Sequence, residues 1–237
     1  MGTVVSFDVP AWTAAPGDDG ALSQVIRWLH WVDATFSPYR AGSDVSRYGR
    51  GEVPLAGCAP ELAEVLGACT EVSERSGGYF TATPGGHLDP SGYVKGWAIE
   101  RAASSLTAAG SDEHSVNGGG DVQCAGQRRW RIGIADPLRR GRLALVVAGQ
   151  DFAVATSGTA ERGAHIVDPH TGRAATGLAS VTVVGPGLTL ADAYATAAFA
   201  MGSRARDWVE SLDGYEAFAI TPAGATWQTS GFAAYVD

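Results

Sequence analysis

Cysteine is scarce in this 237-residue sequence, which contains only Cys58, Cys69 and Cys124. The number is odd, the spacing is wide, and there is no Cys-x-x-Cys pair. A disulfide framework and a structural zinc site are therefore not expected. We expect three reduced thiols, most of them buried in the core.

The sequence also lacks long apolar runs and basic stripes. No apolar stretch could span a bilayer, and the first residues, MGTVVSFDVP, lack the basic and apolar regions of a signal peptide. As written, the chain is expected to have no membrane segment and to be cytoplasmic; a trimmed form of an exported protein would look the same. The formal net charge is −8, so no nucleic acid partner is expected, although a local cluster of donors could hold a small phosphorylated ligand.

Common fingerprints of nucleotide-binding and hydrolytic enzymes are absent. There is no P-loop and no GxSxG elbow. After the glycines of residues 185–187, Leu190 stands where a dinucleotide fold needs its third glycine. Ser157, His165 and Asp168 could form a hydrolase triad in principle, but their spacing matches no known motif.

Hydrophobic periodicity places most predicted helices before most predicted strands. Helices are predicted over about 20–36, 60–76, 94–109, 189–202 and 203–212. Strands are predicted over 3–9, then at HSVN, DVQC, WRIGIAD, RLALVVA, FAVAT, HIVD and SVTVVG, and late in the chain at EAFAIT and GFAAYV. Several of these runs are almost continuously apolar, which indicates a sheet covered on at least one face. The order favours an α+β fold with mixed, largely antiparallel sheets and packed helices, in a single domain over residues 1–237.

Individual residues predict some helix ends and one buried face. Pro60 suits the first turn of a helix, and Gly77 and Gly78 end it. An acid at position 18 or 19 can cap the first helix. The inward face of that first helix is expected to consist of Leu22, Val25, Ile26, Leu29, Val32 and Phe36.

Four short clusters carry the candidate chemistry. The first, LDPSGYVKGWAIERAA (88–103), places Lys95 in the first turn of a predicted helix, where the helix dipole disfavours a cation. A bound phosphate would reverse this, because the amides and the ammonium would both face an anion; the alternative is a solvated surface lysine. The second, VNGGGDV (116–122), has three glycines, Gly118, Gly119 and Gly120, which let the backbone approach a ligand. Its alternative is a hairpin turn at Asn117-Gly118.

The third and fourth clusters supply a histidine and a pair of oxygen donors. ATSGTAERGAHIVDPHTGRAA (155–175) has His165 in a strand-like run, where a lone histidine is more often structural. In TLADAYATAAFAMG (189–202), Asp192 and Thr196 are four residues apart and share one helix face. Their hard oxygens suit Mg²⁺. Alternatively, Asp192 favours the first helical turn and Thr196 bonds back to the helix backbone.

Taken in this order, the four clusters resemble the FAD:protein FMN transferases, the ApbE-like family. The resemblance spans nearly the whole chain, from Met1-Gly2-Thr3 through FSPYRAGSDVSRY (36–48) to beyond Gly202. It implies that FAD binds between two tightly joined lobes of an α+β fold and that Mg²⁺ is needed. Such enzymes split the FAD pyrophosphate, attach FMN to a threonine hydroxyl of a target flavoprotein and release AMP, whereas some members hydrolyse FAD to FMN and AMP.

The resemblance also implies a set of site residues. Mg²⁺ would be held by the main-chain carbonyl of Gly92 and the side chains of Asp192 and Thr196, and His165 would be the general base that takes the threonine proton. The residues implied in FAD binding are Met1, Tyr39, Tyr79, Phe80, Thr81, Asp89, Lys95 and Ile166. The amides of Gly118, Gly119 and Gly120 are expected to add donors to the phosphates.

The chain departs from the family pattern in three places. Thr81 replaces the usual aspartate of a Phe-Asp pair, Asp89-Pro90-Ser91-Gly92 replaces Asp-Leu-Gly-Gly, and the usual tyrosine is missing after residues 157–158. Three functions stay open: an FMN transferase, an FAD pyrophosphatase that uses water, and a flavin-binding module without catalysis. The transferase is the leading interpretation. The metal pair argues against a pure binder, which has little need for it, but the sequence does not separate the transferase from the pyrophosphatase, because the acceptor lies on another protein.

Overall fold

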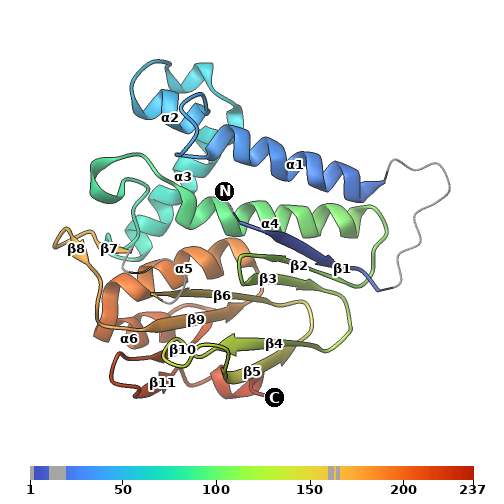
Figure 1. Cartoon of the computed structure of the whole chain (residues 1–237), viewed down its shortest axis with the longest axis vertical. Helices are drawn as coiled ribbons and strands as arrows, with labels where there is room; N and C mark the ends of the chain where they lie inside the picture. Colours follow the sequence, from blue (N-terminus) through green and yellow to red (C-terminus); the bar gives the residue numbers. More distant parts are fainter. Residues whose placement is uncertain (1–2, 11–19, 160–162, 164–165) are drawn as a thin grey trace.

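The computed structural model describes residues 3–10, 20–159, 163 and 166–237. Its centre is a seven-stranded sheet in the order β1-β2-β3-β6-β9-β10-β11, in which every neighbouring pair is antiparallel (Figure 1). The strands of this sheet are β1 (Val5–Asp8), β2 (His114–Gly118), β3 (Asp121–Ala125), β6 (Ala153–Gly158), β9 (Ser180–Gly185), β10 (Glu216–Ile220) and β11 (Thr226–Gln228). Two separate hairpins pair β4 (Trp130–Ala135) with β5 (Leu143–Gly149) and β7 (Val167–Asp168) with β8 (Arg173–Ala174).

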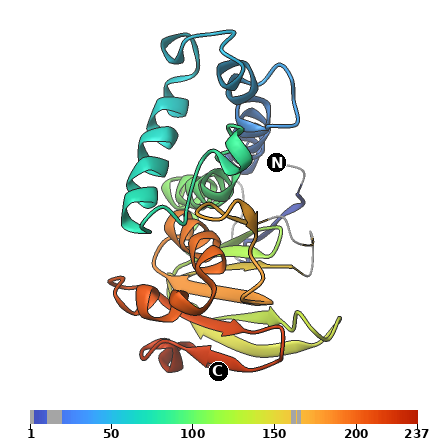
Figure 2. The ribbon, with the colours of Figure 1, turned by 90° about the vertical axis from the view of Figure 1, so that its left-hand side faces the viewer.

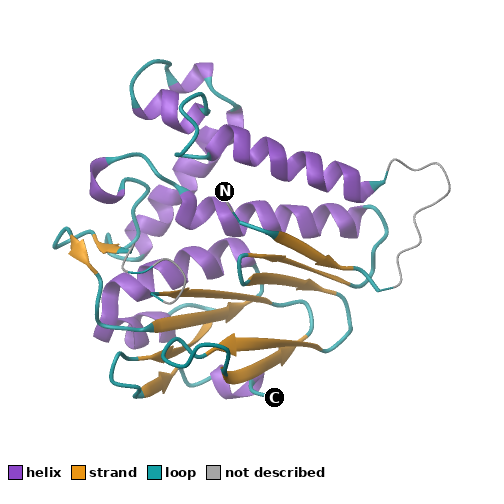
Figure 3. Ribbon diagram, viewed as in Figure 1, coloured by secondary structure: helices purple, strands orange, loops and turns teal. Residues whose placement is uncertain are grey.

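Helices cover one face of the sheet in two layers (Figure 3). α4 and α5 pack against each other and against the strands, and α1 lies on the outer side of α4. The helices are α1 (Ala21–Phe36), α2 (Asp44–Gly49), α3 (Pro60–Arg75), α4 (Ser91–Ala108), α5 (Leu188–Met201) and α6 (Ala205–Glu210), with 3₁₀ turns η1 (Leu55–Gly57), η2 (Pro84–Gly86), η3 (Gly202–Arg204) and η4 (Phe232–Tyr235). No described helix is long and apolar enough to cross a membrane.

The sheet is buried on both faces, which explains its almost continuously apolar strands. In β9, Val181 and Val183 face the cluster under the helices, whereas Val184 faces a second cluster on the opposite side. That second cluster is covered by the β4–β5 hairpin and by η4, through Trp130 and Phe232. The predicted α+β fold with largely antiparallel sheets is confirmed. The division into two lobes and the single-domain boundary stay predictions.

Most predicted helices are found within three residues of their expected ends. α3 begins at Pro60 and ends before Gly77, as predicted. α4 begins at Ser91 rather than Val94, so Lys95 lies just beyond the first helical turn. The prediction that Lys95 sits in the first turn is therefore wrong.

Two further sequence predictions are wrong for local reasons. Ile26 was expected on the inward face of the first helix, but it is 41% exposed. The tail GFAAYV was expected to be a strand, but residues 232–235 form a 3₁₀ turn. Phe232 and Tyr235 are three residues apart, so this turn puts both on one face, against the second core cluster. Asp18 and Asp19, the predicted caps of α1, lie outside the described residues.

The cysteines behave as their number suggested. All three are free, Cys69 and Cys124 are buried, and Cys58 is half-buried. Burial raises the pKa of the Cys69 thiol and that of the Cys124 thiol to about 12. Both thiols therefore stay protonated at neutral pH and act as small apolar core groups.

Candidate active site

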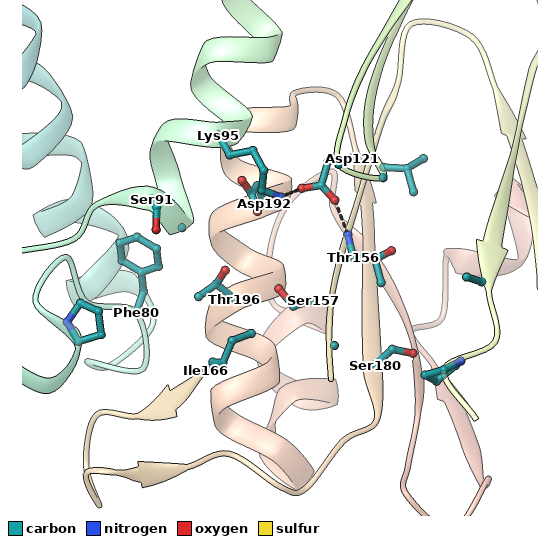
Figure 4. A pocket seen from close by; sticks show the side chains of 18 of the residues that line it. Phe80, Ser91, Lys95, Asp121, Thr156, Ser157, Ile166, Ser180, Asp192 and Thr196 are labelled. Carbon is teal, nitrogen blue, oxygen red and sulfur yellow. Dashed lines mark hydrogen bonds and ion pairs between the residues drawn. The ribbon is translucent and has the colours of Figure 1, made fainter. Parts of the chain in front are cut away.

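A cavity of about 330 Å³ lies between the α4–α5 helix pair and the strands β3, β6 and β9, with β4 as its far wall (Figure 4). Many of the predicted site residues border it. They are Tyr79, Phe80, Thr81, Asp89, Gly92, Lys95, Gly119, Gly120, Ile166, Asp192 and Thr196. Segments far apart in the sequence thus meet at one place, although the roles of these residues stay predictions.

Glycines in α4 allow the two helices of this wall to touch. A Cβ on Gly96 would lie 2.5 Å from the carbonyl oxygen of Leu188 and 2.9 Å from Cβ of Asp192, which is closer than atoms can approach. A Cβ on Gly92 would lie 3.4 Å from Oγ1 of Thr196. Position 96 therefore needs glycine, and the close approach brings Asp192 and Thr196 up to the first turns of α4.

A buried group of charges occupies the inner end of the cavity. The ammonium of Lys95 forms ion pairs with Asp121 and, at 3.1 Å, with Oδ1 of Asp192. The carboxylate of Asp121 also accepts the backbone N–H of Thr156 at 2.9 Å. Both acids are almost fully buried, whereas the Lys95 side chain is 21% exposed. Among the described side chains of this group, two carboxylates face one ammonium.

The second oxygen of Asp192 is held by the backbone of α4. The N–H of Gly96 donates to Oδ2 of Asp192 at 2.9 Å. In a regular helix this N–H would donate to the carbonyl of Gly92, four residues earlier. The carbonyl oxygen of Gly92 therefore loses or shares its usual hydrogen-bond donor. The hydroxyl of Thr196 also lies close to Gly92.

These donors suit a small divalent cation. A carbonyl, a carboxylate and a hydroxyl are hard oxygen ligands, which Mg²⁺ prefers. Within the described ranges, no cluster of three or more His, Cys, Asp or Glu side chains could hold a metal. A metal here would therefore depend on one carboxylate and neutral oxygens, completed by substrate phosphates and water.

The outer part of the cavity is aromatic and apolar. Phe80 is 1% exposed, and Ile166 borders the cavity at the start of the β7–β8 hairpin. The ring of Tyr79 meets His170 edge-on at 4.4 Å between centroids, and its hydroxyl accepts a hydrogen bond from Arg204 at 3.0 Å. Contacts outside the cavity therefore fix the position of Tyr79 in this apolar wall.

Loop residues at the rim are fixed by local hydrogen bonds. Oγ1 of Thr81 accepts the N–H of Thr83 at 3.0 Å, and the carboxylate of Asp89 accepts the N–H of Ser91 at 3.0 Å. Gly119 and Gly120 have φ angles of 64° and 94°, which favour glycine, and both border the cavity.

Four predicted site residues are not placed at the cavity. Gly118 does not border the cavity. A Cβ at this position would lie 2.3 Å from the side chain of Ile99, so glycine is needed here for close packing. Tyr39 is 88% exposed and does not border the cavity. Met1 and His165 lie outside the described residues.

Comparison with known proteins decides the family. The model of the ApbE family matches residues 1–87 and 81–219, which is most of the chain. The chain belongs to the ApbE family.

Curated relatives of this ApbE-family chain are named FAD:protein FMN transferase. The protein from Rhodobacter capsulatus is 37% identical over 165 residues, covering 65% of this chain and 30% of the relative. The protein from Treponema pallidum is 38% identical over 143 residues, covering 51% of this chain and 40% of the relative. The matched part therefore spans less than half the length of either relative.

Solved structures share the fold over almost the entire chain. The flavin transferase ApbE from Vibrio cholerae superimposes with a TM-score of 0.84 at 22% identity, covering 99% of this chain and 96% of that one. The ApbE protein from Thermotoga maritima gives a TM-score of 0.84 at 23% identity, covering 99% and 95%. At these identities the likeness establishes the ApbE fold.

Sequence reasoning missed several residues of the ApbE-family pocket. Asp121 directly follows the glycine triplet in VNGGGDV, but the sequence pattern predicts no role for its side chain. Ser157 and Ser180 border the cavity from neighbouring strands, as do residues 132–135 of β4. The position of Asp121 next to a ligand-approaching glycine turn could have indicated a buried acid, whereas the apolar β4 residues carry no chemical signature.

Proposed function

We propose that this chain is a Mg²⁺-dependent FAD:protein FMN transferase, which attaches FMN by a phosphoester bond to a threonine of a target flavoprotein and releases AMP. The observation that carries the proposal is the composition of one cavity. It combines the oxygen donors of Asp192 and Thr196, the ammonium of Lys95 and an aromatic wall from Tyr79 and Phe80. Relatives that bear this name align with the same chain.

In the proposed transfer, the threonine oxygen forms a bond to the phosphorus of the FMN half of FAD. The bond from that phosphorus to the bridging oxygen breaks, and its electron pair leaves with AMP. The hydroxyl proton passes to a general base, for which we propose His165 on the family resemblance.

The charged part of the cavity would bind a cation more readily than an anion. The buried carboxylates of Asp121 and Asp192 would repel a pyrophosphate that entered without a cation, and among the described side chains only Lys95 pairs with them. Gly92, Asp192 and Thr196 would hold Mg²⁺, which when bound would neutralise the pyrophosphate and the leaving AMP phosphate. The expected consequence is that FAD binds much more tightly with Mg²⁺ than without it.

Lys95 is suited to a second task beside the metal site. Its ammonium is tethered by the buried carboxylate of Asp121, and its side chain is the most exposed member of the charged group. It can therefore donate to a phosphate oxygen that enters the cavity while Asp121 keeps it in place. Tyr79, Phe80 and Ile166 would pack against the isoalloxazine in the apolar outer part.

The test is incubation with FAD and Mg²⁺, with and without EDTA, followed by chromatography for AMP and FMN. Without its target, a transferase is expected to release AMP slowly. With a candidate acceptor, flavin fluorescence should remain on the denatured acceptor protein. Free FMN with unlabelled acceptor would identify a pyrophosphatase instead, and tight FAD binding without AMP in the presence of acceptor would identify a binding module.

A further inference from the structure

Positive charge is concentrated on the β4–β5 hairpin. Residues 128–142 contain six arginines and one acid, Asp136, although the whole chain has 17 Lys and Arg residues and a net charge of −8. All six arginines are exposed: Arg128, Arg129, Arg131, Arg139, Arg140 and Arg142. Figure 2 shows the hairpin, in yellow-green, projecting from the lower part of the molecule. The hairpin is thus a basic projection on an acidic protein.

The two ends of the hairpin differ in how this charge is compensated. At the open end, Arg128 lies 3.9 Å from Asp8, and Arg129 and Arg131 pair with Asp237. At the closed end, residues 136–143, which we call the hairpin tip, Arg139 pairs with Asp136. Arg140 and Arg142 have no carboxylate within ion-pair distance in the described part of the chain.

Exposed apolar side chains accompany the charge at the hairpin tip. Leu138 is 48% exposed and Leu143 is 59% exposed, and both are among the few large apolar side chains at the surface. Arginine beside exposed apolar groups is typical of surfaces that bind proteins. The hairpin tip therefore has the composition of a docking surface rather than of a solvated turn.

The hairpin tip begins where the cavity ends. Residues 132–135 and Pro137 border the cavity, and the arginines follow directly in the chain. Asp136 fixes the turn, because its carboxylate accepts the N–H groups of Leu138 and Arg139 at 2.9 and 3.1 Å. The bond from the N–H of Leu138 is the main reason that the pKa of Asp136 lies below its usual value. The positive tip is thus held at the rim of the cavity.

We propose that the hairpin tip binds an acidic segment of the polypeptide that carries the acceptor threonine. The inference rests on the proposed function, which requires a second protein to bring a hydroxyl into this cavity. The acidic remainder of the surface repels such a segment, whereas Arg140 and Arg142 attract it at the rim. Leu138 and Leu143 add apolar contact area to the charged contacts.

The test measures peptide binding to the full chain. Two short labelled peptides, each with one central threonine, carry either acidic or neutral amide side chains around it, and fluorescence anisotropy gives their affinities. The acidic peptide should bind more tightly, and the double charge reversal Arg140→Glu with Arg142→Glu should weaken it by roughly tenfold. Arg27→Glu, a single charge reversal at an exposed position on α1, is the control for position and should leave peptide binding almost unchanged.

Separate readouts distinguish this proposal from the proposed function. FAD affinity and Mg²⁺-dependent AMP release should be unchanged in the double reversal, and the preference for the acidic peptide should disappear at high salt. Equal binding of both peptides, no binding of either, or equal loss in the Arg27→Glu control would overturn the proposal. Loss of FAD affinity in the double reversal would assign the arginines to the nucleotide, and preferential binding to anionic phospholipid vesicles would assign them to a membrane surface; either result also overturns it.

Discussion

Two walls of the cavity, the α4–α5 helix pair and the β4–β5 hairpin, are built in opposite ways. The α4–α5 wall is a tight helix contact with a glycine at the crossing and a buried ion pair between Lys95 and Asp192. The β4–β5 wall contributes apolar residues to the cavity and keeps its charges on the outside, where Arg140 and Arg142 have no ion-pair partner among the described residues. In the proposed function, the first wall would hold the metal and the phosphates, and the outer surface of the second would meet the acceptor protein. Substitutions in the helix wall should therefore have the larger effects.

The sharpest test of the helix wall is Asp192→Asn. The amide oxygen can still accept the N–H of Gly96, so the fold should persist, but the charge that would hold Mg²⁺ is lost. We expect Mg²⁺-dependent AMP release to fall by roughly 100-fold or more, as for the loss of one preorganised electrostatic group. FAD affinity should also stop responding to Mg²⁺ in titrations of flavin fluorescence. Unchanged turnover would refute the assignment of Asp192 as a ligand.

Gly96→Ala tests whether tight helix packing distinguishes this wall. The added methyl group would lie 2.5 Å from the backbone of Leu188, so the helices must move apart, at a cost of about 1–3 kcal/mol in unfolding free energy. Gly67→Ala is the matched control, because Gly67 is an exposed glycine within α3 with nothing within 4 Å of its Cβ position. That change should stabilise the protein by roughly 0.5–1 kcal/mol. Equal effects of both changes in chemical denaturation would show that the helix contact at Gly96 is no more tightly packed than an open helix surface.

The contacts around the cavity also differ in how well they can be predicted from the sequence. Asp192 and Thr196 are four residues apart on one helix, so their shared face could be predicted from local geometry. Asp121 meets Lys95 across 26 residues and two elements, and no local pattern predicts that contact. The sequence predicts that Lys95 binds a phosphate near the N-terminus of a helix. In the structure, its ammonium forms ion pairs with Asp121 and Asp192. Residues of β4 reach the cavity only because the hairpin packs across the sheet, which depends on the tertiary fold.

Asp121→Asn tests whether the buried acid acts by positioning Lys95. Asparagine can still accept the N–H of Thr156 through its oxygen, but its NH2 group then faces Lys95, so the ammonium loses both the charge and the acceptor beside it. We expect about a tenfold rise in KM for FAD, a smaller change in kcat, and a loss of about 1–2 kcal/mol in stability. An equal fall in kcat without a change in KM would show that Asp121 acts in some other way than by holding Lys95.

The smallest expected effect is a dependence of the unfolding free energy on pH, which we expect from a buried histidine behind the cavity. His114, the first residue of β2, is fully buried, and its ring nitrogens bond to the carbonyl of Ala103 on α4 and the hydroxyl of Ser111. Burial lowers the pKa of His114, and these hydrogen bonds only partly oppose that shift. The unfolded chain therefore binds a proton more readily than the folded one, and stability should decline as the pH falls through about 6.5, the ordinary histidine value.

The decline should be visible as a fall in unfolding free energy between neutral and mildly acidic pH, measured in urea. His114→Gln should flatten the profile in this range while lowering stability at neutral pH, since the buried hydrogen bonds are disturbed. His30→Gln is the control, because that side chain is exposed on α1. If the profile kept its slope in His114→Gln, the acid sensitivity would belong to other groups. If His114→Gln kept both the pH dependence of stability and a normal rate of AMP release, the helix layer behind the cavity would serve only to support the fold. The difference between the two walls would then depend on the charges of the cavity alone.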